Sequence, residues 1–91
     1  MNINDAKARL KKIRTTLGLT QGELGSLFDV DRRTVFHWET IDNGRNTIPL
    51  DKMYYLETFG ISSGWILTGE GVMFKRMVED VKGDILKKIS E

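Results

Sequence analysis

The fold of this chain is decided by residues 19–39, which read LTQGELGSLFDVDRRTVFHWE. The stretch begins with a capping box, because the Thr20 hydroxyl can accept a hydrogen bond from the Glu23 amide while the Glu23 carboxylate reaches back to the Thr20 amide. Leu24 and Phe28 lie four positions apart, which is the spacing of one helix face. We therefore predict a short helix that begins just after Thr20 and buries these two apolar side chains.

A second helix is predicted within the same stretch. Asp29-Val30-Asp31 interrupts the first pattern, and Asp31 is a good N-cap because its carboxylate can accept hydrogen bonds from free amides at the positive end of a helix. Val35 and Trp38 lie three positions apart and form the inner stripe of this helix. Two short helices separated by about three residues are typical of a helix-turn-helix.

A longer helix is predicted upstream of this stretch. Its apolar residues recur at helical spacing, namely Ala6, Leu10, Ile13 and Leu17. Asn4 is suited to the N-cap of this helix, and Gly18 is suited to the left-handed position just after its end. We expect the apolar stripe to face the core.

Three further helices are predicted downstream of residues 40–48, which form a polar loop. Pro49 suits the first turn of the fourth helix, and Gly60 is expected to end it. The inner face of that helix is expected to include Leu50, Met53 and Leu56. One of the two adjacent tyrosines is also expected to face inward, with Tyr54 as the candidate. Ser62 caps a fifth helix that carries Trp65 and Ile66 and closes at Gly69.

The sixth helix is amphipathic and lies at the end of the sequence. Its apolar positions recur every three to four residues and are Met77 or Val78, Val81, Ile85 and Ile89. Gly83 interrupts this pattern and weakens the helix by about 1 kcal/mol relative to alanine. The pattern as a whole predicts an all-α fold.

Composition restricts the class of protein. The 91 residues suffice for one domain, and the absence of cysteine removes disulfides, thiol nucleophiles and cysteine-based metal sites. With a single histidine, no nucleophile–base pair can be assembled convincingly, so we expect neither an enzyme nor a bound metal or cofactor. The polar N-terminus lacks a signal-peptide core, and no apolar run reaches the roughly 18 residues of a membrane span. We therefore expect a soluble, cytoplasmic protein.

Charge alone leaves nucleic-acid binding open, because the net charge is only +1. Two basic clusters stand out, one in the first helix (Lys7, Arg9, Lys11, Lys12 and Arg14) and one at the start of the third (Arg32 and Arg33). A run of charges is usually a solvated helix face, and we favour that interpretation for the first cluster.

Residues 19–39 resemble the helix-turn-helix of the lambdoid phage repressor, Cro and XRE-type regulators. The similar positions are Leu19-Thr20-Gln21, Leu24-Gly25, Phe28, Val30-Asp31, Thr34-Val35 and Trp38-Glu39. Gly60-Ile61-Ser62 and residues 65–71 (WILTGEG) resemble the fifth helix of that family and its exit. The resemblance covers roughly residues 8–74 and implies a compact five-helix repressor-like DNA-binding domain over residues 1–74. Residues 75–91, the sixth helix, match no motif of the family.

The resemblance also assigns structural roles. Family members pair an arginine of the first helix with a glutamate that ends the third, so Arg14 and Glu39 are expected to form an internal ion pair. Gly25 should let the second and third helices approach closely, and Val30 should fill the gap beneath the turn. Asp29 replaces the family's turn glycine, although aspartate tolerates a left-handed backbone better than most residues.

The resemblance places the start of the third helix in the major groove of DNA. Helix periodicity puts four residues opposite Val35 and Trp38, and these are the expected base-reading residues: Arg32, Arg33, Phe36 and His37. Arginine can bind guanine through two acceptors, and Phe36 could pack on a thymine methyl group. Phosphate contacts are expected from Gln21, Thr34, Arg45 and Asn46. The alternative is a solvated face on which one arginine contacts phosphate only.

The function implied is that of a sequence-specific transcriptional regulator that binds double-stranded DNA, most simply a phage or prophage repressor of the Cro or CI type. Such a module would bind a palindromic operator as a homodimer in the bacterial cytosol, associated with the nucleoid. We favour the sixth helix as the dimerisation element over its packing on its own domain. An antitoxin or a restriction–modification controller would share this chemistry, and a protein-interaction module is the alternative of a different class.

Overall fold

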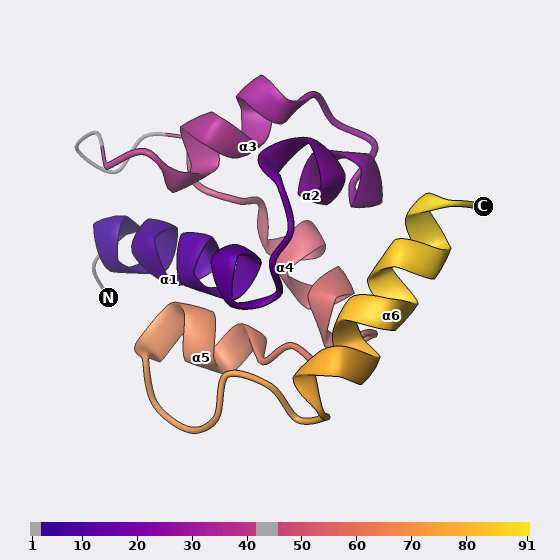
Figure 1. Ribbon diagram of the computed structural model, residues 1–91. Helices are drawn as coiled ribbons and strands as arrows, with labels where there is room; N and C mark the ends of the chain where they lie inside the picture. The colour runs from indigo at the N-terminus through magenta and orange to yellow at the C-terminus, as the bar shows by residue number, and fades with distance from the viewer. Residues whose placement is uncertain (1–2, 42–45) are drawn as a thin grey trace.

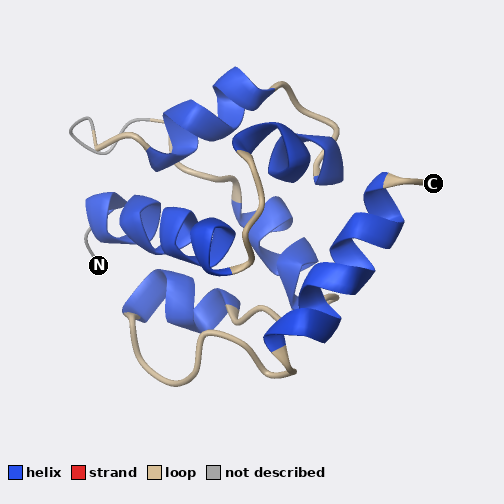
Figure 2. Ribbon diagram, viewed as in Figure 1, coloured by secondary structure: helices blue, strands red, loops and turns tan. Residues whose placement is uncertain are grey.

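The structure, a computed structural model, describes residues 3–41 and 46–91. These residues form six helices. They are α1 (Ile3–Thr16), α2 (Gln21–Leu27), α3 (Arg32–Glu39), α4 (Leu50–Glu57), α5 (Ser63–Thr68) and α6 (Val78–Ile89). α1 runs through the molecule with α3 on one side and α5 on the other, and α6 lies beside α2 (Figure 1). Within the described ranges there is no strand (Figure 2), so the all-α prediction is confirmed.

The contact between α2 and α3 is as close as a glycine allows. A Cβ atom at Gly25 would lie 2.7 Å from the Val30 carbonyl oxygen, so a larger residue would push the two helices apart. The chain turns between them at Asp29, which has a left-handed backbone with a φ of 56°, a conformation that aspartate adopts more readily than most residues. Both expectations for this turn are confirmed, and Val30 packs against the core as expected.

The start of each of these two helices is capped as the sequence predicts. The Glu23 amide donates to the Thr20 hydroxyl at 3.0 Å, and the Thr20 amide donates to the Glu23 carboxylate at 2.8 Å. Asp31 caps α3 by accepting from the Arg33 amide at 2.7 Å. The N-cap predicted at Asn4 is wrong, because α1 already includes Ile3.

The core is formed by one apolar side of each helix. The predicted stripe of α1 is fully buried, and it meets Val35 of α3, Leu56 of α4 and Ile66 of α5, none of which is exposed to solvent. Trp38 is also buried, and Trp65 packs partly buried against the same cluster. Gly18, which follows α1, has the predicted left-handed backbone.

The inner face of α4 differs from the prediction. Met53 and Leu56 are buried, but Leu50 and Tyr54 are 54% and 56% exposed. Tyr55 faces inward instead, and its ring packs edge-on against the Phe28 ring with 6.1 Å between the ring centroids. The physical reason is that α4 has apolar residues on more than one side, and its neighbours cover only the side of Met53, Tyr55 and Leu56. Pro49 is the N-cap and precedes the first turn of α4 instead of lying within it.

The segment between α4 and α6 is held by polar contacts and short turns. Glu57 accepts hydrogen bonds from the Ser63 amide and hydroxyl, both at 2.7 Å, and forms an ion pair with Lys75 at the same distance. Ser62 caps α5 through the Trp65 amide, and Gly69 ends it with a left-handed backbone, as predicted. The contacts of Glu57 hold the start of α5, and the later segment at Lys75, against the end of α4.

Helix α6 completes the core of the same globule. Val81 and Ile85 are fully buried, and the helix packs against α2 (Figure 1). The apolar stripe that suggested dimerisation is therefore used inside the chain, and dimerisation through the remaining surface of α6 stays a prediction. Met77 precedes the helix and is 73% exposed. The Cα radius of gyration is 12.1 Å, and none of the described helices is long and apolar enough to cross a membrane.

Candidate nucleic-acid interface

The orientation of α3 is set by two side chains on its inner face. Val35 is fully buried and Trp38 is 5% exposed. The Trp38 ring meets the edge of the Phe28 ring with 5.7 Å between centroids. Because residues three apart share a helix face, burying this pair turns the opposite face of α3 outward.

Three of the residues expected to read bases, Arg33, Phe36 and His37, lie on that outward face, and Arg32, three residues before Val35, lies at its edge. Arg32, Arg33, Phe36 and His37 are all exposed, and Phe36 leaves 49% of its surface open to solvent. The Phe36 and His37 rings touch edge-to-face at 5.6 Å. Within residues 3–41 and 46–91, neither arginine side chain has a hydrogen-bond or ion-pair partner. The predicted set is therefore brought together on one surface, which we call the α3 face.

A shallow depression lies where the α3 face meets the start of α2. It is lined by Gln21, Asp31, Arg32, Arg33 and Phe36. Two guanidinium groups and one carboxylate border it, and the carboxylate is occupied by the Arg33 amide. This surface has a net positive charge, several hydrogen-bond donors and one apolar ring.

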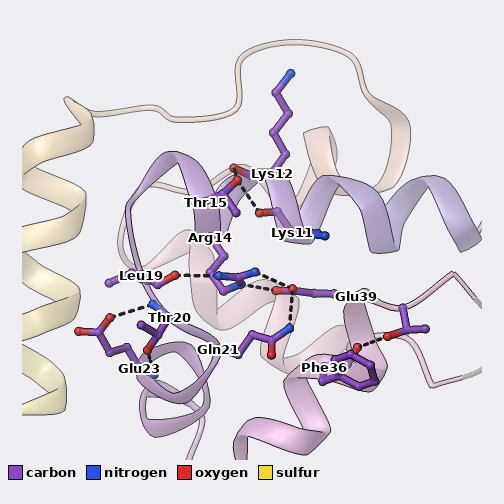
Figure 3. A network of polar contacts seen from close by, with 11 residues as sticks. Lys11, Lys12, Arg14, Thr15, Leu19, Thr20, Gln21, Glu23, Phe36 and Glu39 are labelled. Atoms are coloured by element: carbon purple, nitrogen blue, oxygen red, sulfur yellow. Dashed lines mark hydrogen bonds and ion pairs between the residues drawn. The ribbon is translucent and has the colours of Figure 1, made fainter.

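A buried polar network holds α3 to α1 and α2 (Figure 3). The Arg14 guanidinium donates to both Glu39 carboxylate oxygens, at 2.7 and 3.0 Å, and to the Leu19 carbonyl at 2.8 Å. Gln21 donates to the same carboxylate at 3.2 Å. The Glu39 side chain is only 3% exposed. The expected ion pair is confirmed, and through Gln21 it extends to the edge of the depression.

Lys7 is a further residue of this support, and the sequence prediction missed it. Its side chain is fully buried, and its ammonium group donates to the His37 carbonyl at 2.7 Å and to the Asn46 carbonyl at 3.3 Å. The prediction of a solvated face is therefore wrong for this residue. The signal was present in the spacing, because Lys7 lies seven positions, about two turns, before Arg14 and so shares its helix face.

Arg9 also departs from the solvated-face prediction. Its guanidinium donates to the Ile66 carbonyl at 2.9 Å near the end of α5. A cation near a helix C-terminus interacts favourably with the carbonyl end of that helix. Lys11 and Lys12, in contrast, are exposed as expected.

The residues expected to contact phosphate are less uniform. Gln21 is half-buried and engaged with Glu39, and Thr34 is half-buried on α3. Asn46 is exposed, and its backbone is left-handed with a φ of 53° and held by Lys7. Arg45 lies outside the described residues. Of the three that the structure describes, Gln21 lines the depression.

The part of the chain that the structure describes has no group of three side chains suited to hold a metal ion. The chemistry that the α3 face offers is hydrogen-bond donation, positive charge and one exposed aromatic ring. Comparison of the chain with protein-family models, with curated proteins and with solved structures finds no match.

Proposed function

We propose that this chain is a sequence-specific double-stranded DNA-binding protein, a transcriptional regulator that uses α2 and α3 as a helix-turn-helix. The proposal rests mainly on the exposure of the Arg32 and Arg33 side chains and on their lack of partners in the described residues. Both side chains are exposed and without partners in the described residues, at the start of a helix whose other side is locked in the core.

The composition of the α3 face suits the major groove of DNA. A groove about 12 Å wide admits a helix, and arginine binds the two acceptors of guanine. Phe36 adds an apolar contact, and His37 can donate or accept at a base edge.

The support beneath the face also suits recognition. Arg14, Lys7 and Glu39 tie the C-terminal part of α3 to α1, and Val35 and Trp38 tie its inner side to the core. A surface held in place before binding loses less conformational entropy when it binds. Gln21 lies at the border of the depression, where the phosphate backbone of DNA beside the major groove would pass.

A single module of this size buries a limited area on DNA, so a two-fold dimer on a palindromic operator is part of the proposal. The two copies of α3 would then lie about 34 Å apart, one turn of DNA. A repressor of the Cro or CI type is the regulator that this arrangement favours.

The test is a titration of the full chain with random-sequence duplex DNA at low and at physiological salt. We expect affinity to fall steeply as salt rises, because bound phosphates release counterions. On the tightest duplex that the wild type selects from a randomised library, the variant R32A/R33A should bind at least about tenfold more weakly, since each guanine contact is worth roughly 1–3 kcal/mol of discrimination.

The matched control is K11A/K12A, which removes the same charge from another adjacent, exposed pair. Lys12 points away from the side of Phe36 and Gln21 (Figure 3). Duplex affinity in this control should stay within about twofold of the wild type. Equal losses in the two variants would mean that only net charge matters, and no binding by the wild type would refute the proposal.

A further inference from the structure

The exposed ring of Phe36 is the feature of the α3 face that charge does not explain. It is 49% exposed although it lies between cationic and polar neighbours. The His37 ring lies edge-to-face against it, with 5.6 Å between ring centroids. The ring also borders the same depression as Arg32 and Arg33.

An aromatic ring in the major groove has few apolar partners to contact. The base edges there present hydrogen-bond donors and acceptors, and the C5-methyl group of thymine is the apolar exception. Cytosine has only hydrogen at this carbon unless it is methylated, and 5-methylcytosine places the same methyl group in the same part of the groove. The chemistry that fits Phe36 is therefore a 5-methylpyrimidine, whichever of the two bases carries the methyl group.

The neighbouring arginines indicate what lies beside this base. Arg32 and Arg33 precede Phe36 by four and three residues, which is about 6 and 4.5 Å along the helix axis. Bases in one strand are stacked about 3.4 Å apart. With α3 lying along the groove, as proposed, a guanine bound by either arginine therefore lies within about two base steps of the pyrimidine.

We infer that the α3 face selects duplexes in which a 5-methylpyrimidine lies within two base steps of a guanine, and that it binds the methylated form of such a site more tightly than the unmethylated form. This inference rests on the proposed function and adds the chemical group that is read. On this inference, the affinity for a duplex depends on its methylation as well as on its sequence.

The test begins with duplexes selected by the wild-type chain from a randomised library. In the tightest duplex each thymine is replaced in turn by uracil, which removes only the methyl group. We expect one or two positions at which affinity falls about three- to fivefold, the effect of exposing one methyl group. A duplex with a 5-methylcytosine–guanine pair at such a position should bind the protein more tightly, by a similar factor, than a duplex with a cytosine–guanine pair there.

Variants assign the effect to the ring. F36A should bind thymine and uracil duplexes equally, whereas F36L should keep most of the difference. Y54A is the matched control, because Tyr54 is an aromatic residue with 56% exposure on α4, and it should keep the full difference. Thermal melting verifies that all three variants fold.

Two different failures are distinguishable. If the wild type binds duplexes through Arg32 and Arg33 but ignores the methyl group, or if F36A keeps the difference, the methyl inference is wrong while DNA binding stands. If no duplex is enriched and R32A/R33A behaves like the wild type, the proposed function fails, and this inference fails with it.

Discussion

The two basic clusters of this chain look alike in the sequence and behave differently in the folded molecule. In α1, Lys7, Arg9 and Arg14 each donate to a backbone carbonyl of another segment, and Arg14 also pairs with Glu39. In α3, Arg32 and Arg33 are exposed, and within the described residues their side chains contact no acceptor.

The difference shows that a basic residue is informative only when its partner is known. Lys7, Arg9 and Arg14 of α1 satisfy carbonyl groups at or near the ends of other elements, so they act on stability; we call them the supporting cluster. Arg32 and Arg33 have side-chain donors without an acceptor in residues 3–41 and 46–91, so they are available to a ligand; we call them the presenting cluster.

The largest effect on stability is expected from Arg14→Met. The change leaves the Glu39 carboxylate, 3% exposed, without its cation, and breaking a buried pair in this way costs about 3–5 kcal/mol. Urea denaturation monitored by tryptophan fluorescence measures the loss. R14M/E39M should recover a large part of it, because the unpaired charge is gone. A loss below about 1 kcal/mol in the single variant would place Arg14 outside the supporting cluster.

Lys7→Met should have the next largest effect. It removes the donor of the His37 and Asn46 carbonyls, and unsatisfied groups of this kind cost about 1–3 kcal/mol. Lys11→Met, one turn further along α1 and exposed, should change the free energy of unfolding by less than about 0.5 kcal/mol. Equal effects of the two substitutions in urea denaturation would contradict the assignment of Lys7 to the support.

An intermediate case is the exposed pair between Lys75 and Glu57. The hydrogen bond from Lys75, together with the hydroxyl and amide of Ser63, lowers the pKa of Glu57 from 4.5 to about 2. A carboxyl group with a depressed pKa stabilises the fold above its unfolded pKa, and this stabilisation is lost as the pH falls from 4.5 towards about 2. Because both side chains are partly solvated, we expect about 1 kcal/mol.

The measurement for this pair is the urea midpoint at about pH 6 and about pH 3 in the wild type and in Glu57→Gln. The variant should be less stable at the higher pH and approach the wild type at the lower one. Parallel curves with a constant offset would show that the pKa of Glu57 is the same in the folded and the unfolded chain, contrary to the expected depression.

The smallest effect on stability is expected from R32A/R33A. Two exposed side chains that have no partner among the residues the structure describes contribute little to the fold, so the free energy of unfolding should change by less than about 0.5 kcal/mol, although the duplex affinity falls. A destabilisation comparable to that of Lys7→Met would remove the contrast between the clusters.

Much of this division could be predicted from local spacing. The capping box, the Asp31 cap and the Gly25 contact depend on residues close in sequence, so their geometry follows from residue type. The Val35 and Trp38 pair predicted which face of α3 is exposed for the same reason. The partner of Arg14 required a family resemblance, because Glu39 lies 25 residues away.

The remainder depends on which neighbours cover a surface. Lys7 was misjudged because its acceptors are backbone carbonyls, which the sequence pattern does not reveal, although its spacing to Arg14 indicates the helix face on which it lies. Leu50 was misjudged because α4 is short and apolar on two sides, and only packing selects between them. In α6 the stripe of Val81 and Ile85 was recognised, but its occupant, the chain's own core, could not be predicted from periodicity.

The surface that meets DNA can be located by mapping backbone amide shifts as duplex DNA is added to the isotope-labelled chain. We expect the largest changes on residues 31–37 and on Gln21, while α5 and α6 change little apart from any surface used in dimerisation. Shifts concentrated on α4, α5 or α6 with α3 unchanged would contradict this expectation, because the presenting cluster would then not be the surface that meets DNA.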